Sequence, residues 1–341
     1  MMRTTHFIKT IPLSPIGIYN ALKNSPFSFK ETLGYFIRNS YGPSYKNKDI
    51  VKYNPQSFCL NENVVPEYRV AFIGDIMDMA GRNETVSENI KQFVQDCDYL
   101  VGNFEATITN DDNKGYSLAQ RHSIQILEPL AELFEPDRTF LNFANNHAGD
   151  FDYKVFSDSV AKIQSKGFQI FGTAQKPFAD ISNDIRIVAG TTISNRDCDY
   201  IVKLDDVITY YRPDKFNILY PHWGYDLELF PRPATVTLAK KLISDFDAII
   251  GHHAHIPQAV TSTNSEENDS DANKLIAYGL GDFCIWEELK HYLYGMVIKV
   301  DIGPNFLGKW QIGQVEWRFI TCQEKNATDW ETKIIDTFPY L

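Results

Sequence analysis

The sequence has few cysteines and no long apolar run. Its 341 residues include five cysteines, scattered along the chain without a CxxC pair. This usage argues against a disulfide scaffold and favours a reducing compartment. No run of about 18 apolar residues occurs, so we expect no transmembrane helix. The N-terminus also lacks a continuous apolar segment followed by a small-residue cleavage site. We therefore expect a cytoplasmic protein without a secretory signal.

Positive charge is scarce overall but concentrated near the N-terminus. The net charge is −11, which argues against a nucleic-acid partner. Residues 1–60 carry eight Lys and Arg against Glu31 and Asp49, a local charge of +6, so the remainder carries −17. A basic arm on an acidic body can contact a membrane surface, RNA or a partner protein. The alternative is a solvated extension that packs back onto the body. Peripheral membrane association through this arm therefore stays open.

The pattern of polar and apolar residues divides the chain into three parts. We predict a basic, irregular extension over residues 1–66, a body over residues 67–320 and a C-terminal tail over residues 321–341. Within the extension, residues 16–22 and 29–37 are expected to form short helices, and no clear strand is expected.

In the body, short apolar strands alternate with amphipathic helical segments. The expected strands are residues 69–73, 99–101, 139–143, 168–171, 185–189, 216–220 and 248–250, and the expected helices are residues 84–97, 124–134, 155–164 and 234–246. Residues 261–273 are polar and acidic, which predicts an exposed loop. Later strands at residues 275–278, 292–300 and 314–319 are expected to form a second sheet. The alternation predicts an α/β fold.

Five of the predicted strands end in a polar cluster. The clusters are Gly-Asp75, Gly-Asn-Phe-Glu105, Asn-Asn-His147, His222-Trp-Gly and Gly-His-His253-Ala-His255. In α/β sheets, ligands gather beyond the carboxyl ends of the strands. We therefore expect the five clusters to meet at one rim.

The residue types in these clusters point to a metal site. On an extended segment, residues i and i+2 face the same way, so His253 and His255 can both reach one ion. The set combines imidazole, carboxylate and amide oxygen without a thiolate, which favours Zn, Mn or Fe at a hydrolytic site over a structural zinc. Two ions held about 3.5–4 Å apart would activate a water molecule and polarise the scissile group.

The motifs also carry a resemblance to a known family. They are Phe72-Ile-Gly-Asp75-Ile-Met77, Gly102-Asn-Phe-Glu105, Ala144-Asn-Asn-His147-x-x-Asp150, His222-Trp-Gly224, Gly251-x-His253-x-His255-x-x-Gln258 and Tyr278-x-Leu280-Gly-x-Phe283. In this order they resemble the CapA-type capsule synthesis (poly-γ-glutamate biosynthesis) proteins of the calcineurin-like metallophosphoesterase superfamily. The resemblance implies a four-layer α/β/β/α sandwich over roughly residues 68–300.

The resemblance assigns a role to each matching residue. Asp75 and His255 would bind a first metal. Asn146, through its amide oxygen, would bind a second metal together with His222 and His253. His147 would be the general acid for the leaving group.

Several matches leave alternatives open. Either Glu105 or Asn103 stands where the superfamily has a bridging aspartate, and Glu105 is favoured because a carboxylate neutralises paired cations. Met77 replaces the histidine usual in the superfamily, so the site holds either one or two ions. Asp226 and Asp282 replace a Glu and an Asn of the family.

The roles of four further polar residues are less defined by the sequence. Asp226 is expected to orient His222, or to be a loop carboxylate in water. Asp150 is expected to cap the helix beginning near Asp152, or to orient the His147 segment. Arg121 and Arg196 are candidates for binding an anionic substrate, or for surface salt bridges.

Three functions follow as hypotheses. The first is a metal-dependent hydrolase of phosphoesters or related anionic small molecules. The second is a role with a capsule or polyanionic polymer such as poly-γ-glutamate, either in processing or as an accessory protein. The third is a metal-stabilised scaffold that binds a partner through the basic arm. Family members often carry an N-terminal membrane anchor, and this sequence shows none.

Overall fold

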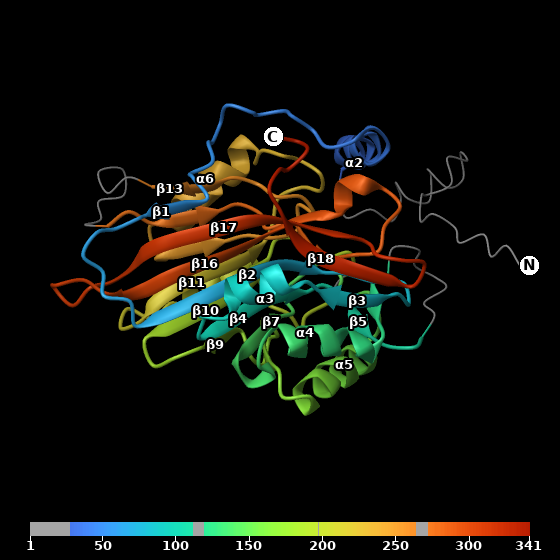
Figure 1. The fold of residues 1–341 in the computed structure, drawn as a ribbon, viewed down its shortest axis with the longest axis horizontal. Helices are drawn as coiled ribbons and strands as arrows, with labels where there is room; N and C mark the ends of the chain where they lie inside the picture. The colour runs from blue at the N-terminus through green and yellow to red at the C-terminus, as the bar shows by residue number, and fades with distance from the viewer. Residues whose placement is uncertain (1–27, 112–118, 197, 264–271) are drawn as a thin grey trace, which may run out of the picture.

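Two large β-sheets form the centre of the protein. The computed structural model describes residues 28–111, 119–196, 198–263 and 272–341, and these form an α/β fold (Figure 1). The first sheet has the order β3 (Asn83–Val86), β18 (Asp329–Ile335), β17 (Trp310–Glu324), β16 (Tyr294–Pro304), β2 (Tyr68–Ile76), β4 (Tyr99–Phe104), β7 (Thr139–Asn142) and β8 (Gln169–Phe171), with β1 (Ser57–Cys59) beside β17 and β15 (Asp282–Cys284) beside β2. The second sheet has the order β13 (Val260–Ser262), β14 (Leu275–Ala277), β12 (Ala248–Ile250), β11 (Phe216–His222), β10 (Ile185–Thr191) and β9 (Phe178–Asp180). The short strands β5 (Thr107–Ile108) and β6 (Arg121–His122) pair with each other.

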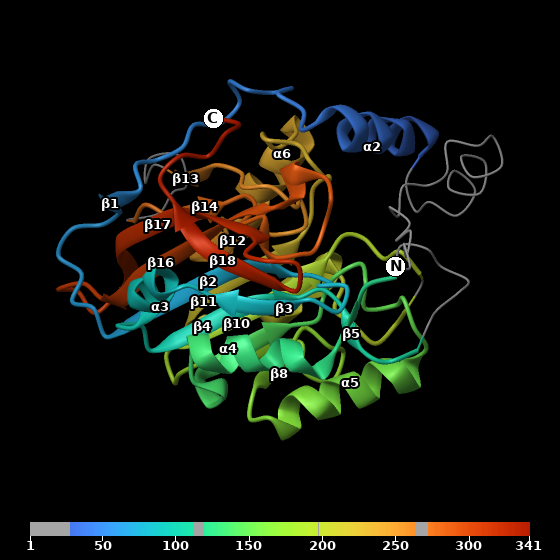
Figure 2. The same ribbon diagram turned by 45° about the vertical axis from the view of Figure 1, so that its right-hand side comes forward.

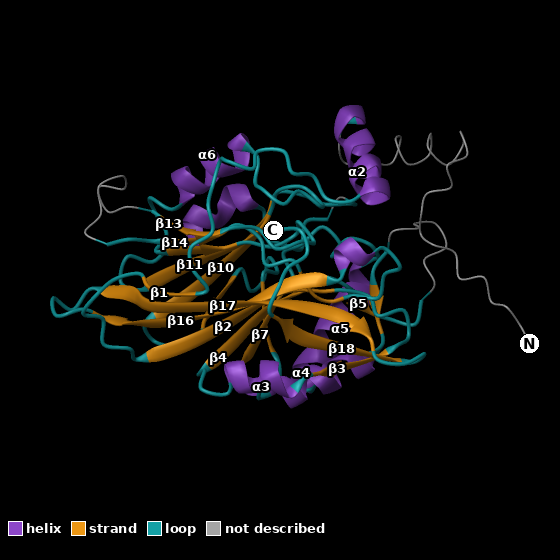
Figure 3. Ribbon diagram, turned by 45° about the horizontal axis from the view of Figure 1, so that its top comes forward, coloured by secondary structure: helices purple, strands orange, loops and turns teal. Residues whose placement is uncertain are grey.

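The described residues also form five α-helices and four 3-10 turns. They are α2 (Phe29–Tyr41), α3 (Glu88–Val94), α4 (Leu127–Leu133), α5 (Tyr153–Ser165) and α6 (Pro233–Leu242), with the 3-10 turns η1 (Ile124–Ile126), η2 (Pro136–Arg138), η3 (Leu204–Tyr210) and η4 (Lys290–Tyr292). Figures 1 and 3 show α3, α4 and α5 on one side of the sheets and α6 on the other. No helix in the described part of the chain is long and apolar enough to cross a membrane.

Strand β2 shows how the sequence produces this layering. Val70 and Phe72 belong to a core that also contains residues of the second sheet, such as Ile187, whereas Ala71 and Ile73 belong to a core shared with α3, α4 and α5. Alternate residues of a strand point to opposite faces, so a strand buried on both faces must be apolar throughout. Burying one side chain of the size of Phe72 contributes about 1.5–3 kcal/mol to the free energy of unfolding.

Most strands expected from the sequence are present, and three expectations are wrong. Residues 84–97 do not form one helix, because Glu84 and Val86 are buried with strand periodicity in β3 and the helix begins only at Glu88. The strands β16 and β17 do not join the second sheet; β16 pairs with β2 in the first sheet. The extension, for which no strand was expected, forms the strand β1 within its described part, and β1 pairs with β17. The sequence showed that β16 and β17 are apolar strands, but it did not show which strands they pair with.

Both ends of the described chain contribute to the fold. The helix expected at residues 29–37 is present as α2, which Ser28 caps by accepting a hydrogen bond from the Glu31 backbone N–H. In Figure 2, α2 lies apart from the helices that cover the sheets. The helix expected at residues 16–22 lies outside the described residues, as does most of the polar loop at residues 261–273. Residues 321–341, predicted as a tail, contain β18, which pairs with β17 and β3.

Candidate metal centre

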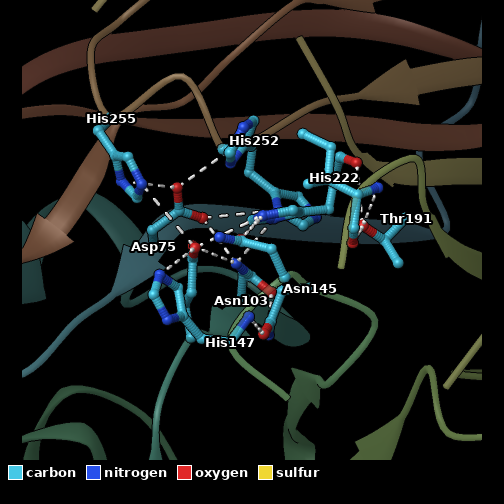
Figure 4. Close-up of polar contacts among 12 residues, drawn as sticks. Asp75, Asn103, Asn145, His147, Thr191, His222, His252 and His255 are labelled. Carbon is cyan, nitrogen blue, oxygen red and sulfur yellow. Dashed lines mark hydrogen bonds and ion pairs between the residues drawn. The ribbon is translucent and has the colours of Figure 1, made fainter. Parts of the chain in front are cut away.

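The candidate centre lies where the carboxyl ends of strands from both sheets meet. Strands β2, β4 and β7 run parallel, and they place Asp75, Asn103 and Asn142 near their ends. Strand β11 of the other sheet ends at His222, which forms a bridge with His252. Figure 4 shows the side chains of Asp75, Asn103, His222 and His252, with those of His147 and His255, pointing toward one another. The predicted convergence of the polar clusters is therefore what the topology produces.

Asn103 holds two buried carboxylates in place. Its side-chain amide donates to Asp75 Oδ1 at 2.7 Å and to Glu105 Oε2 at 3.0 Å. Its oxygen accepts hydrogen bonds from the amides of Asn142 at 2.9 Å and Asn145 at 3.2 Å. All four hydrogen bonds lie among buried side chains, where each amide group needs a partner. The Asn103 oxygen is thus already engaged, which favours Glu105 over Asn103 as the ligand.

Glu105 presents one oxygen to the middle of the histidine cluster. Its Oε1 lies 3.5 Å from His222 Nε2, 3.8 Å from His255 Nε2 and 4.0 Å from His147 Nε2. Within the described residues this buried oxygen has no hydrogen-bond partner. A buried carboxylate oxygen that faces three imidazoles is a suitable ligand for a cation between them.

The His222 ring contacts a different neighbour through each of its two nitrogens. Its Nε2 lies 2.5 Å from Asn146 Oδ1, and its Nδ1 lies 2.7 Å from Nδ1 of His252. The Asn146 amide oxygen therefore reaches His222, as a shared metal site would require. His252 was not among the residues that the sequence singled out, although the Gly-His-His run contains it.

The backbone conformation that brings His253 and His255 to the centre differs from the expected one. They do not lie on an extended segment, because their φ angles are 96° and 51°. Non-glycine residues seldom adopt this left-handed region, and they cluster at functional sites when they do. The backbone N–H of His253 donates to Asp75 Oδ2 at 3.0 Å, which helps hold this turn. Neither ring nitrogen of His253 has a hydrogen-bond partner in the described part of the chain.

The potential ligands fall into four overlapping groups of three. In each group the ligand atoms lie within 4.8 Å of one another; the groups are Asp75, His222 and His252; Glu105, His222 and His253; Asp226, His253 and His255; and Asp75, His255 and Asp282. Five of the six ligands expected from the sequence occur in these groups, and the sixth, Asn146, contacts His222. The donor set of imidazoles and carboxylates fits a divalent transition metal.

Burial disfavours the charged forms of the side chains in the centre, and a bound cation would offset this effect for the carboxylates. Burial is the main cause that raises the pKa of Asp75 to about 7 and the pKa of Glu105 well above its ordinary value. Burial also lowers the pKa of His253 to about 4 and that of His222 well below its ordinary value, so both rings are neutral and able to bind metal. Burial opposes the charge on His255, but the carboxylates around it raise its pKa well above the ordinary value.

His147 and Asp150 form a buried pair beside the ligands. His147 Nδ1 lies 2.6 Å from Asp150 Oδ2, which also accepts a hydrogen bond from the Gln120 backbone N–H at 2.8 Å. The pair fixes the ring so that Nε2 faces Glu105. Helix α5 is capped by Asp152, not by Asp150. The capping role expected for Asp150 is therefore wrong, and its other expected role, with the His147 segment, agrees with the contact.

The remaining predicted residues are distributed around the rim. Asp226 Oδ1 lies 3.6 Å from His255 Nε2, so it accompanies His255 rather than His222. Arg196 donates to the backbone oxygen of Asp150 at 3.2 Å and so lies near His147. Arg121 donates to the backbone oxygen of Asp111 and is exposed.

Helix α2 of the extension supports the loop that carries Asp226. The buried Arg38 side chain donates to the backbone oxygen of Asp226 at 2.6 Å and lies 3.3 Å from a carboxylate oxygen of Glu228. Asn39 accepts a hydrogen bond from the Tyr292 hydroxyl at 2.8 Å. The sequence separation of 188 residues between Arg38 and Asp226 explains why sequence patterns did not reveal this contact.

The fold and the centre together define an α/β protein with a buried cluster of histidines and carboxylates suited to a divalent metal. The sequence profile of the family described as "Bacterial capsule synthesis protein PGA_cap" matches residues 69–200 and 203–286. The chain belongs to this family, the CapA-type capsule synthesis proteins. The match is consistent with membership of the metallophosphoesterase superfamily.

Curated relatives agree with this assignment. The chain is 26% identical over 250 residues to "Capsule biosynthesis protein CapA" of Bacillus anthracis, covering 63% of this chain and 59% of that protein. It is 22% identical over 277 residues to "PGA biosynthesis protein CapA" of Bacillus subtilis, covering 72% of this chain and 70% of that protein. A "Probable polyglutamine synthesis accessory protein" of Mycobacterium tuberculosis is 24% identical over 226 residues, covering 54% of this chain and 55% of that protein.

Proposed function

We propose that the protein is a metal-dependent hydrolase that acts on an anionic substrate, either a phosphoester or a linkage in a capsule polymer of the poly-γ-glutamate type. One observation carries the proposal: buried ligand atoms on Glu105 and His253, which have no hydrogen-bond partner among the described residues, lie beside the His147–Asp150 pair. A purely structural cluster would be expected to satisfy its buried polar atoms within the protein.

The residues of the chain supply positioning and proton transfer in this proposal. Asp75, Glu105, Asn146, His222, His253 and His255 would hold one or two Mn, Zn or Fe ions. A bound ion would supply Lewis-acid polarisation of the scissile group. Asn103 keeps the Asp75 and Glu105 carboxylates in position. As a water molecule attacks the scissile group and the bond breaks, His147 Nε2 would give its proton to the leaving atom, which is the alcohol oxygen of a phosphoester or the amide nitrogen of a γ-glutamyl linkage. Asp150 would hold the opposite ring nitrogen.

We also propose that the layers form the four-layer α/β/β/α sandwich of the metallophosphoesterase superfamily. The support is that one core joins the two sheets, while α3, α4 and α5 share a second core with the large sheet. In that arrangement the ligands come from the facing edges of two sheets, which fixes them against relative movement.

The test combines metal analysis with hydrolysis. Protein prepared without chelator is analysed for Mn, Zn and Fe, and is then assayed with Mn on a chromogenic phosphodiester and on poly-γ-glutamate. We expect hydrolysis of one of the two, reduced about 10²–10⁴-fold in His147→Ala because general acid catalysis is lost. Asp158→Asn, a change at an exposed residue of α5, serves as a control that should keep its activity. Absence of transition metal after reconstitution would refute the metal site and the hydrolase together.

An accessory role without catalysis is the second candidate. The observation that favours it is the naming of the relatives for capsule biosynthesis and polyglutamine synthesis, without mention of hydrolysis. In that case the protein would bind metal and polymer but would turn over neither substrate. Binding of poly-γ-glutamate with the same affinity by the unaltered protein and by His147→Ala, without cleavage, would favour this role.

We further propose that α2 associates with an anionic membrane surface. Phe29, Leu33, Ile37 and Tyr41 recur every four residues along the helix and are 67%, 48%, 51% and 88% exposed, so they form one apolar stripe. The exposed charged residues of α2 and of the segment that follows it as far as residue 52 are mainly lysines: Lys30, Lys46, Lys48 and Lys52 against Asp49. An exposed apolar stripe combined with lysines is typical of a segment that binds an anionic membrane interface.

Vesicle sedimentation tests this association. The protein should bind vesicles containing phosphatidylglycerol more strongly than neutral vesicles, and added salt should weaken the binding. Replacing Leu33 and Ile37 with glutamate should abolish it. Ile208, which is 45% exposed on η3, provides a matched control, because Ile208→Glu removes an exposed apolar side chain elsewhere. Equal binding by the stripe variant and the control would exclude α2 as the membrane-binding element.

A further inference from the structure

We propose that Asp282 is a metal ligand that takes the place left by Met77, and that it completes a second ion site with Asp75 and His255. The inference rests on the proposed metal dependence of the protein. It concerns a residue to which the matching motifs assign no role.

Strand β15 brings Asp282 directly beside Asp75. The two strands run parallel, and Asp282 and Asp75 are partners in the register between β15 and β2. The Asp75 backbone N–H donates to the Gly281 oxygen at 2.9 Å. A Cβ atom on Gly74 would lie 1.9 Å from the same oxygen, so only glycine permits this approach. The close pairing places two fully buried carboxylates next to each other.

Asp282 offers one oxygen for orientation and one for ligation. Its Oδ1 lies 2.8 Å from His255 Nδ1, which fixes the imidazole. Its Oδ2 is buried and has no hydrogen-bond partner in the part of the chain that the structure describes. A residue that only oriented His255 would leave this second oxygen buried and unsatisfied, which is unfavourable. A cation bound by Asp75, by Oδ2 of Asp282 and by His255 Nδ1, which would exchange its contact with Oδ1 for the ion, would satisfy it.

Met77 cannot act as a metal ligand in place of the histidine that the superfamily usually has at this position. Its side chain is buried in a small apolar cluster with Leu227, Ile285 and Tyr292. A thioether in such a cluster prefers soft metals and cannot neutralise a divalent cation. The nearby carboxylate of Asp282 supplies the missing negative charge and an oxygen ligand.

The ligand groups then divide into two ion sites. Glu105, His222 and His253 form one group, and Asp75, His255 and Asp282 form another that shares none of these residues. The two groups approach each other through Glu105 Oε1, which lies 3.8 Å from His255 Nε2. The protein thus has enough ligands for two ions despite the absence of a histidine at position 77.

Metal stoichiometry of matched variants tests the assignment. Asp282→Asn keeps an oxygen that can accept from His255 but removes the charge, and His222→Ala removes a ligand of the other site. With Mn added alone, we expect two ions in the unaltered protein, one in each variant and none in the double variant. Asp158→Asn, the same change at an exposed residue of α5, should still bind two. Circular dichroism should confirm folding of each variant.

A spectroscopic variant keeps the inference testable if Asp282→Asn folds poorly. Asp282→Cys loaded with Co should show a thiolate-to-cobalt charge-transfer band, because only a coordinated sulfur gives one. Two ions bound to Asp282→Asn with unchanged affinity, or no band from Asp282→Cys, would overturn the assignment while leaving the metal-dependent function intact. An orienting residue would lower metal affinity without changing the stoichiometry. Absence of metal from the unaltered protein would instead refute the proposed function, and this inference with it.

Discussion

Glu84 provides a test of stability that is independent of the metal centre. Its carboxyl group is buried in the large sheet, where Thr332 donates to Oε1 at 2.5 Å and Cys322 donates to Oε2 at 3.5 Å. Burial is the main cause that raises its pKa from 4.5 to about 7. The folded protein therefore favours the protonated carboxyl group, whereas the unfolded chain ionises it at lower pH.

The direction of the pH effect follows from this difference. Below about pH 4.5 the group is protonated in both states and contributes no pH dependence. As the pH rises from about 4.5 to about 7, only the unfolded chain releases the proton, so the free energy of unfolding falls. A shift of this size corresponds to about 3 kcal/mol, at about 1.4 kcal/mol for each pH unit. Above pH 7 the loss stays constant.

Comparing Glu84→Gln with the unaltered protein isolates the effect of this one group. Glutamine is neutral at every pH and keeps an acceptor for Thr332. Urea denaturation from pH 4.5 to pH 8 should show the variant gaining about 3 kcal/mol relative to the unaltered protein. The histidines of the metal centre titrate in both proteins, so their contribution cancels in the difference. Parallel pH profiles for the two proteins would refute the buried, protonated state of Glu84.

Three further predictions concern the centre and its support. Arg38→Ala should lower the free energy of unfolding by about 1–3 kcal/mol in urea denaturation, since it leaves a buried carbonyl and a carboxylate without their donor; an unchanged value would show that α2 does not hold the Asp226 loop. Removal of the metal by a chelator should lower the melting temperature of protein purified with metal, because free metal at about 1,000 times its Kd adds about 4 kcal/mol to the free energy of unfolding. The Asp158→Asn variant, changed at an exposed residue away from the ligands, should show the same decrease. Asp150→Asn should lower hydrolysis while leaving metal content unchanged, because Asp150 contacts His147 and belongs to no ligand group; loss of metal would place Asp150 among the ligands instead.

The sequence predicted those parts of the centre that lie at strand ends. Asp75 and His222 follow apolar runs, and parallel strands bring their carboxyl ends to one edge, so local patterns were sufficient. The His253 and His255 pair was found by its spacing, although the left-handed turns that bring it to the centre leave no simple signature. The spacing rule thus selected two residues that the structure places in the candidate centre, although the local geometry it assumed is not the observed one.

Contacts between distant segments were beyond the reach of sequence patterns. Arg38 lies in an extension whose composition indicated only charge, yet its side chain reaches Asp226. Strand β16 was recognisable as a strand, but an apolar run does not specify which sheet it joins. Glu84 was assigned to a helix because the buried alternation of β3 is only four residues long. Each of these features depends on a partner that lies far away in the chain.

The position of β16 also bears on how the protein can be divided. The family profile ends at residue 286, but β16 begins at Tyr294 and pairs with β2, the strand that carries Asp75. A fragment trimmed to the matched residues would leave β2 without a partner on one side as far as Ile73, because β15 pairs only with Asp75 and Ile76. Such an edge exposes unpaired backbone groups and invites aggregation. We therefore expect a recombinant fragment that ends at residue 286 to be less stable and more prone to aggregate than one that continues through β18, which ends at Ile335.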